Sequence, residues 1–315
     1  MNILITGATG FIGSHLVERI LAEKKHKLIL IKRKISDIWR IKDFINKCLV
    51  YDYFELKDLE KIFIENKIDL IIHLATKYVK YENDVNEINE MINTNINFPS
   101  NLLYYADKYE VRYFINTGTC FEYELVNKKI NENGKQKPFN FYASTKLAFE
   151  EILRYYSLNK NIKAITLKLF YPYGEKDNNS KLIPFLIRSI IQNKEITLTK
   201  GEQKLDYTYI EDIVDAYLKS IDYIKKIKNY DVFNIGSSKA VKIKEIVNYL
   251  FKLAQKKMKV DFGKISYNLN EIMFLEADNK KAEKFLGWKP KNSIYDGLKK
   301  TYNFYIKNLN FLTYD

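Results

Sequence analysis

Residues 2–17, NILITGATGFIGSHLV, decide the fold of this chain. A short run rich in isoleucine predicts a buried strand and residues 14–17 begin a helical pattern, so the three glycines between them lie in a strand-to-helix turn. Glycine lets the backbone turn tightly and approach phosphate oxygens, and the start of a helix offers free N–H groups. The stretch therefore predicts a site for the pyrophosphate of a nicotinamide dinucleotide. The expected contacts are Gly7, Thr9, Gly10, Phe11, Ile12 and Gly13.

The end of the next expected strand, 27–32, bears on which dinucleotide binds. A carboxylate there favours the ribose of NAD(H), whereas a basic residue accommodates the additional phosphate of NADP(H). Arg33, which lies 20 residues beyond Gly13, and Lys34 stand at this position, and the first acid follows at Asp37. The position predicts NADP(H). NAD(H) is the alternative, in which case the basic residues form an ordinary surface group.

Apolar β-branched runs alternate with helical patterns over the first 170 residues, which is typical of βαβ units and a parallel sheet. The fold class predicted is α/β: a Rossmann-type doubly wound parallel sheet with a smaller C-terminal α/β substrate-binding region. We expect the dinucleotide-binding domain at 1–175 with a returning segment near 206–238, and the second region at 176–205 and 239–315. A mobile loop is expected at 127–139. Expected strands are 2–6, 27–32, 70–74, 113–117, 164–170 and 232–235; expected helices are 14–24, 56–66, 95–109 and 144–159.

Composition excludes several classes of protein. The 315 residues are 46% hydrophobic and 29% charged, as in globular proteins, and no apolar run approaches the length of a membrane span. Two cysteines, Cys48 and Cys120, do not suffice for a disulfide framework or a metal cluster, and no export signal is visible, so we expect a cytoplasmic protein without a metal. The net charge is +13, but only six of the 52 basic residues are arginine and the lysines alternate with acids. This pattern indicates a solvated surface rather than a nucleic-acid site.

A candidate chemical centre follows the 113–117 strand. Tyr142 and Lys146 are four residues apart and share one helical face. A cation near a phenol favours its anion, so this pair can pass a proton to or from a carbonyl or alcohol oxygen while the cofactor carries hydride. Thr119 is the hydroxyl expected to bind the reacting oxygen, with Thr117 as the second choice.

These residues resemble the extended short-chain dehydrogenase/reductase family, in its nucleotide-sugar epimerase/dehydratase branch. The resemblance extends along nearly the whole chain. It implies that Asp52 and Tyr53 hold the adenine, that the segment Leu74, Ala75 and Thr76 lies beside the cofactor, and that Asn95 lies near the active site. Further matching segments are 173–174, 206–212, 234–236 and 286–290.

Within this branch, segments 71–76, 201–203 and 270–274 look most like the CDP-abequose and CDP-paratose synthases. The resemblance implies NADPH-dependent reduction of the 4-keto group of a nucleotide-linked deoxysugar. It also implies a homodimer through the helices near 95–109 and 144–159. Implied substrate contacts are Thr119, Cys120, Tyr171 and Lys204.

Departures from the family pattern narrow this expectation. Cys120 and Phe121 stand where dehydratases carry an acid pair, so 4,6-dehydration is not expected. Leu205 and Asn268 replace arginines that hold the substrate diphosphate, and Lys204 is the expected substitute for the first. Tyr171 replaces the usual asparagine.

Other interpretations differ in class. An NAD-dependent nucleotide-sugar 4-epimerase would use the same three catalytic residues but recycle its cofactor. A catalytically idle dinucleotide-sensing or nucleic-acid-binding protein would not need them. His15 and His73 are expected to serve packing or local hydrogen bonding, and Glu122 to face water.

Overall fold

The computed structural model describes residues 1–53, 55–79, 84–256 and 260–312. Within them a parallel seven-stranded sheet has the order β11-β6-β5-β4-β1-β2-β3. This is the doubly wound Rossmann arrangement predicted from the sequence. Its strands are β1 (Asn2–Thr6), β2 (Lys27–Lys32), β3 (Leu49–Asp52), β4 (Leu70–His73), β5 (Tyr113–Thr119), β6 (Lys163–Leu169) and β11 (Tyr230–Ile235).

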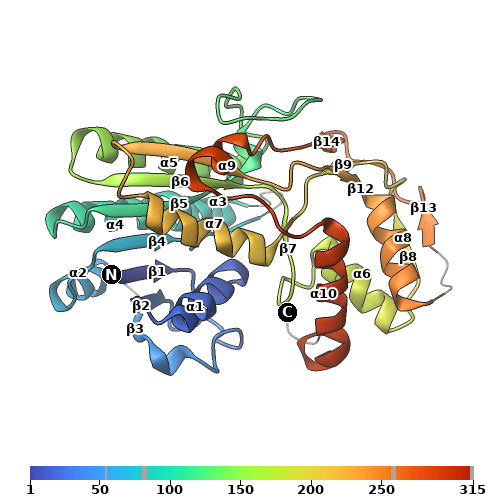
Figure 1. Cartoon of the computed structure of the whole chain (residues 1–315), viewed down its shortest axis with the longest axis horizontal. Coiled ribbons are helices and arrows are strands. Elements are labelled where there is room, and N and C mark those ends of the chain that lie inside the picture. Colours follow the sequence, from blue (N-terminus) through green and yellow to red (C-terminus); the bar gives the residue numbers. More distant parts are fainter. Residues whose placement is uncertain (54, 80–83, 257–259, 313–315) are drawn as a thin grey trace.

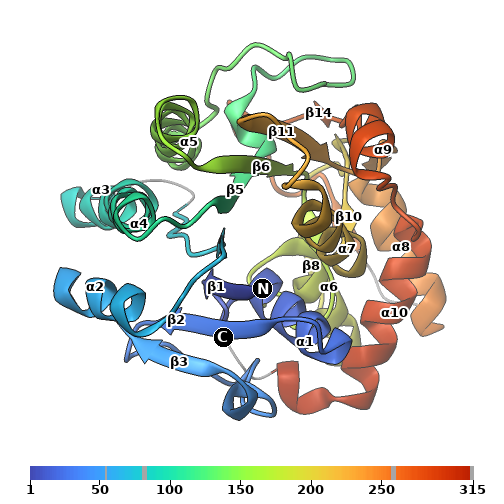
Figure 2. The same ribbon diagram turned by 60° about the vertical axis from the view of Figure 1, so that its left-hand side comes forward.

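Helices cover both faces of the sheet, because alternate residues of each strand point to opposite faces. On β1, Ile3 and Ile5 join the core beneath α1 and α7, while Leu4 joins the core beneath α2, α4 and α5. Figure 2 shows these two layers on opposite sides of the sheet. The helices are α1 (Phe11–Glu23) and α7 (Ile210–Tyr223) on one face, and α2 (Leu56–Glu65), α3 (Val85–Ile92), α4 (Phe98–Lys108) and α5 (Phe141–Asn159) on the other.

A second group of elements lies beyond the carboxyl ends of the strands, to the right in Figure 1. Its helices are α6 (Leu182–Ile191), α8 (Ile243–Ala254) and α10 (Ile294–Lys307). Short strand pairs tie it together: β7 (Pro172–Tyr173) with β10 (Thr208–Tyr209), β8 (Ile196–Leu198) with β13 (Val260–Phe262), and β9 (Lys204–Leu205) with β12 (Val241–Lys242) and β14 (Phe274–Leu275). Helix α9 (Lys280–Leu286) differs from the rest of 239–315, because it packs against α7 and β11 of the main sheet. The predicted domain boundaries stay predictions.

Three local features depart from the expected elements. The edge strand β3 was not predicted, and α3 precedes the expected helix at 95. A π-helical turn, η2 (Asn93–Asn97), joins α3 to α4. The 127–139 segment is not a free loop. Ile130 is buried and pairs with Ala277, and the Glu132 carboxylate accepts a hydrogen bond of 2.8 Å from the backbone N–H of Asn234.

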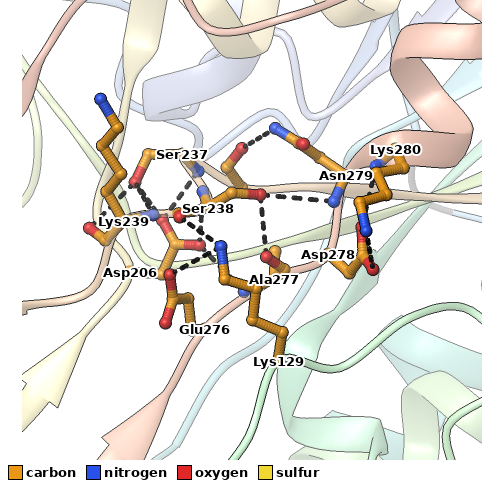
Figure 3. A network of polar contacts seen from close by, with 11 residues as sticks. Lys129, Asp206, Ser237, Ser238, Lys239, Glu276, Ala277, Asp278, Asn279 and Lys280 are labelled. Carbon is orange, nitrogen blue, oxygen red and sulfur yellow. Dashed lines mark hydrogen bonds and ion pairs between the residues drawn. The ribbon is translucent and has the colours of Figure 1, made fainter.

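Asp206 joins the second group of elements to the main sheet (Figure 3). Its buried carboxylate accepts hydrogen bonds from the backbone N–H groups of Ser237, Ser238 and Ala277, at 2.7, 3.0 and 3.0 Å, and from the Ser237 hydroxyl. Gly236 leaves the room for this arrangement, since a Cβ there would lie 2.8 Å from Asp206 Oδ2 and 2.3 Å from the Ala277 Cβ. One carboxylate therefore fixes the end of β11 against the segment that follows β14.

Asp206→Ala should lower the free energy of unfolding by about 3 kcal/mol, because it leaves one buried and two partly buried backbone N–H groups without their acceptor. Urea unfolding measures this. The matched control is Asp215→Ala, which removes a half-buried carboxylate paired with the exposed Lys291 at 3.1 Å and should cost less than about 1 kcal/mol. Similar losses in the two variants would contradict the role given to Asp206.

Candidate active site

One cavity of about 2050 Å³ runs from the glycine turn to the second group of elements, along the carboxyl ends of the strands. Small-molecule sites usually occupy about 300–1,000 Å³, so this cavity has room for two ligands side by side. Lining residues at one end come from the glycine turn and β2, those in the middle from β5 and α5, and those at the far end from β9 and the 268–272 segment.

The glycine turn fits a pyrophosphate. Gly7 has φ +73°, and a Cβ on it would lie 2.5 Å from the Ala75 nitrogen. A Cβ on Gly13 would lie 2.2 Å from the Gly7 oxygen, so both positions exclude any side chain. Helix α1 begins after Gly10 with no side-chain cap and no acid in its first turn, which leaves backbone N–H groups for an anion. Thr9, Phe11 and Ile12 also line the cavity.

The end of the cavity beside β2 carries the guanidinium of Arg33. Arg33 lines the wall beside Ser36, and its guanidinium makes no hydrogen bond or ion pair within the described residues. Lys34 is at the surface outside the lining. Arg40, which sequence analysis did not select, also lines the cavity; its Nε donates to the Lys176 oxygen at 2.9 Å and its guanidinium lies 4.1 Å from the Trp39 ring centroid. No motif marks Arg40, because it lies in the loop after β2.

The two nearby carboxylates, Asp52 and Asp37, differ in position. Asp52 lies 2.5 Å from Lys32 Nζ and is absent from the lining of the cavity within the described residues, so its side chain does not reach the place expected for the adenine. Asp37 does line the cavity, and its Oδ1 accepts a hydrogen bond of 3.0 Å from the Trp39 N–H. Tyr53 does line the cavity, with its ring 4.8 Å from that of Phe98.

The segment after β4 forms the wall beside the glycine turn. Leu74, Ala75 and Thr76 line the cavity. Asn95 does not line it; it is fully buried and holds the segment from behind, accepting from the Lys77 N–H at 2.8 Å and from Thr76 Oγ1 at 3.1 Å. The π-helical turn directs Asn95 inward, so its effect on a cofactor is through this segment.

Tyr142 and Thr119 line the middle of the cavity, and Lys146 is buried one helical turn behind Tyr142. Asn140 caps α5 by accepting the Ala143 N–H at 2.9 Å, which sets the first turn that carries Tyr142. The Thr117 hydroxyl donates to the His73 oxygen at 2.8 Å and lies 2.6 Å from the Tyr217 hydroxyl. Because Thr117 is engaged in this way, Thr119 is the better placed of the two hydroxyls.

Burial sets the protonation of the central pair. It raises the pKa of Tyr142, although a hydrogen bond with the Thr76 side chain works against this, so the phenol is protonated at neutral pH. Burial also lowers the pKa of Lys146, while the carboxylates of Glu122 and Glu150 work to raise it. The pair can thus offer a proton from Tyr142 with a cation behind it.

The expectation that Glu122 faces water was wrong. Its side chain is fully buried, Oε1 accepts the Thr119 N–H at 2.7 Å, and Oε2 lies 2.8 Å from Lys168 Nζ. The two histidines have the local roles predicted for them. His73 Nδ1 lies 2.8 Å from Thr6 Oγ1, and His15 Nε2 lies 2.9 Å from the Glu175 oxygen.

Aromatic and aliphatic side chains dominate the cavity around the turn after β5. Cys120 and Tyr171, the expected substrate contacts, line it together with Phe121. The Tyr171 and Phe121 rings are 5.6 Å apart, and Tyr171 has φ +28°, a strained value for a bulky residue. Burial raises the pKa of the Cys120 thiol to about 12.

Lys204 is not brought to this cavity. Along 201–205, buried and exposed residues alternate, so Gln203 and Leu205 face the cavity while Lys204 faces away. Lys204 instead lines a separate depression beside Phe274. Leu205 and Asn268, the two positions without the family's arginines, do line the main cavity.

Within the described residues, no cluster of histidine, cysteine, aspartate and glutamate could hold a metal ion. Among the same residues, no helix combines the length and apolar character that crossing a membrane requires.

Comparison with known proteins agrees with this geometry. The profile of the NAD dependent epimerase/dehydratase family matches residues 3–236. CDP-abequose synthase of Salmonella muenchen is 31% identical, over 95% of this chain and 96% of its own. dTDP-4-dehydro-6-deoxyglucose reductase of Escherichia coli is 30% identical, over 95% and 96%. The crystal structure of UDP-glucuronic acid 4-epimerase from Bacillus cereus, in complex with UDP-glucuronic acid and NAD, is similar with a TM-score of 0.87 at 27% identity, over 98% of this chain and 100% of that one.

Gly7→Ala should lose dinucleotide binding and lower the free energy of unfolding, since the methyl group meets both a positive φ and the backbone after β4. Gly287→Ala is the matched control: its φ is +63°, but a Cβ there meets nothing within 4 Å, so it isolates a strain cost of about 1–2 kcal/mol. Thermal unfolding and fluorescence titration with NADPH measure the two effects. Equal destabilisation with binding retained in both variants would contradict the close approach at Gly7.

Proposed function

This chain belongs to the NAD dependent epimerase/dehydratase family, and we propose that it reduces the 4-keto group of a nucleotide-linked deoxysugar with NADPH. It is an enzyme of nucleotide-sugar modification that uses a nicotinamide dinucleotide. The 4-keto reduction, the deoxysugar and the phosphorylated cofactor are the proposal.

The free guanidinium of Arg33 is the observation that carries the proposal. It lies on the cavity wall beside the Ser36 hydroxyl, at the end of β2, where the ribose of the adenosine half is held in this fold. A phosphate can take bidentate hydrogen bonds from it. The Asp52 carboxylate pairs with Lys32 Nζ and lies outside the lining within the described residues, so it offers a ribose hydroxyl no acceptor in the cavity. Asp37 lines the cavity, and one of its two oxygens accepts the Trp39 N–H. NADPH is the form of the cofactor that is consumed in net reductions.

The residues in the middle of the cavity have complementary roles. When bound, the nicotinamide dinucleotide supplies hydride. Tyr142 donates its proton to the C4 oxygen of the sugar, and the Lys146 ammonium stabilises the phenolate left behind and binds the ribose. The Thr119 hydroxyl donates a hydrogen bond to the same oxygen and polarises the carbonyl.

Elimination of water is not proposed, because the residues after Thr119 cannot perform it. Cys120 is a buried thiol that stays protonated over the physiological range, and Phe121 has no proton to exchange. The aromatic lining around Tyr171 also suits a sugar with fewer hydroxyl groups.

A nucleotide-sugar 4-epimerase is the second candidate. The similar solved structure from Bacillus cereus is an epimerase with NAD bound, and the same three catalytic residues would serve both reactions. An epimerase would keep its cofactor and show no net consumption of it.

The homodimer implied by resemblance stays a prediction, which sedimentation of the chain would test. Helices α4 and α5 expose Tyr104, Tyr155 and Leu158, as an apolar contact between two copies would require.

The chain should oxidise NADPH only when a 4-keto nucleotide sugar is added, in an assay at the cofactor's absorbance with CDP-, dTDP- and GDP-linked substrates. Tyr142→Phe should lower kcat about 100- to 10,000-fold with NADPH affinity unchanged, because it removes the proton donor and little else. Tyr155→Phe, on the exposed side of the same helix, is the control. Absence of turnover with every substrate would reject the proposal.

Arg33→Ser should weaken NADPH about 10- to 100-fold and leave NADH affinity unchanged, as expected for loss of about 1.5–3 kcal/mol of charged hydrogen bonding. Isothermal titration with both cofactors measures this. Lys34→Ser, which removes the neighbouring cation outside the cavity, should change neither affinity. Equal weakening of NADPH and NADH would favour the epimerase.

A further inference from the structure

The polar face of α5 that carries Tyr142 and Lys146 continues with further charged residues. Tyr142, Lys146, Glu150 and Arg154 follow one another at four-residue intervals and so share one face of the helix. Lys146 and Glu150 are buried, whereas Arg154 is partly exposed at the rim, 3.7 Å from Glu150 Oε1. The catalytic lysine is thus flanked by the phenol on one side and a carboxylate on the other.

Two further charged residues, Glu122 and Lys168, are buried beside this helical face. Lys168, on β6, extends its ammonium to 2.8 Å from Glu122 Oε2 and 3.2 Å from Glu150 Oε2. All three side chains are almost completely buried. Gly118 makes the space, because a Cβ there would lie 3.0 Å from Glu122 Oε1 and 3.1 Å from Lys168 Cγ. We call Glu122, Lys146, Glu150 and Lys168 the buried charge cluster.

The buried charge cluster affects the protonation of Lys146. Burial disfavours the ammonium of Lys146, which makes no ion pair within 4 Å in the described part of the chain. The Glu122 and Glu150 carboxylates favour that ammonium. Two carboxylates and one lysine would leave a buried negative charge near Tyr142 and oppose formation of its anion. Burial raises the pKa of Glu122 to about 7, while the Lys168 ammonium at 2.8 Å favours the ionised carboxylate. With both carboxylates ionised, Lys168 cancels the second one and the cluster is neutral.

Other groups around Lys146 add little charge. His73 faces it from β4 and is neutral, because burial lowers its pKa well below the usual value. Burial raises the pKa of the Tyr123 and Tyr230 hydroxyls, so both stay protonated. The partly exposed Arg154 also pairs with the exposed Glu151, with 3.3 Å between Arg154 Nε and Glu151 Oε1. The four members of the cluster therefore set the local charge.

We propose that Glu122, Glu150 and Lys168 are positioning residues that keep Lys146 in its ammonium form by making the buried charge cluster neutral. This inference rests on the proposed function, in which Lys146 binds the cofactor and stabilises the Tyr142 anion. Glu122 has a second task. Its other oxygen accepts the Thr119 N–H, so one carboxylate links Lys168 to the turn that presents the Thr119 hydroxyl.

The test is the pH dependence of NADPH affinity, which needs no knowledge of the sugar substrate. Affinity falls at alkaline pH as Lys146 loses its proton. Glu122→Gln keeps an oxygen for the Thr119 N–H but leaves the cluster with one excess positive charge, so the Lys146 ammonium becomes less stable. This alkaline fall in NADPH affinity, called the alkaline limb below, should move to lower pH by about 1 pH unit.

The double variant Glu122→Gln/Lys168→Met separates charge from structure. It leaves Lys146 and Glu150 as a neutral pair, so the alkaline limb should return toward that of the unaltered chain even if the protein is less stable. Glu151→Gln, which removes an exposed carboxylate one residue from Glu150, is the control and should not move the limb. If Glu122→Gln does not fold, Glu150→Gln should move the limb in the same direction.

Two results would overturn the inference: a folded Glu122→Gln or Glu150→Gln variant with an unmoved limb, or a double variant no closer to the unaltered chain than the single one. Either would leave the proposed function standing. No NADPH binding by the unaltered chain at any pH would instead reject the proposed function, and the inference with it.

Discussion

The contact of backbone with backbone at the first turn is the constraint on which the rest of the structure depends. Gly13 approaches the Gly7 carbonyl so closely that no side chain fits, and Gly7 approaches the end of β4 in the same way. These contacts bring the start of α1 against two neighbouring strands. The free N–H groups of the helix then point along the carboxyl ends of the sheet, where the catalytic side chains also emerge.

A second constraint is that Lys146 carries its charge in the protein interior, where burial disfavours an ion. In the proposed reaction Tyr142 donates a proton and Lys146 stays charged, in surroundings that disfavour ions. Two carboxylates, Glu122 from the turn after β5 and Glu150 from α5, favour the Lys146 ammonium, and Lys168 on β6 pairs with both of them. The same turn carries Thr119. Cofactor site, proton donor and hydroxyl are consequently fixed by a few elements of one sheet, while the substrate end is built from shorter strands of the second group.

The sequence predicts the parts of this arrangement that depend on local pattern. β1 and β2 have the expected bounds because both strands are buried on two faces and read as continuous apolar runs. The glycine turn and the Tyr142–Lys146 pair are likewise visible from spacing alone. The sequence pattern does not predict β3, because it is an edge strand of four residues, none of them buried.

Features that depend on distant partners could not be read in this way. Glu122 follows a strand like an ordinary loop residue, and only its pairing with Lys168 on β6 explains its burial. Arg40 reaches the cavity through a loop of no regular pattern. Lys204 was expected in the cavity, but the two-residue period of its short strand gives that side to Leu205.

Transfer of deuterium from NADPH labelled at the nicotinamide C4 tests the central claim most directly. Net reduction predicts one deuterium at C4 of the sugar product for each NADP⁺ formed, measured by mass spectrometry and NMR. A product that forms without accumulation of NADP⁺, with the label still on the cofactor, would contradict the account and identify an epimerase.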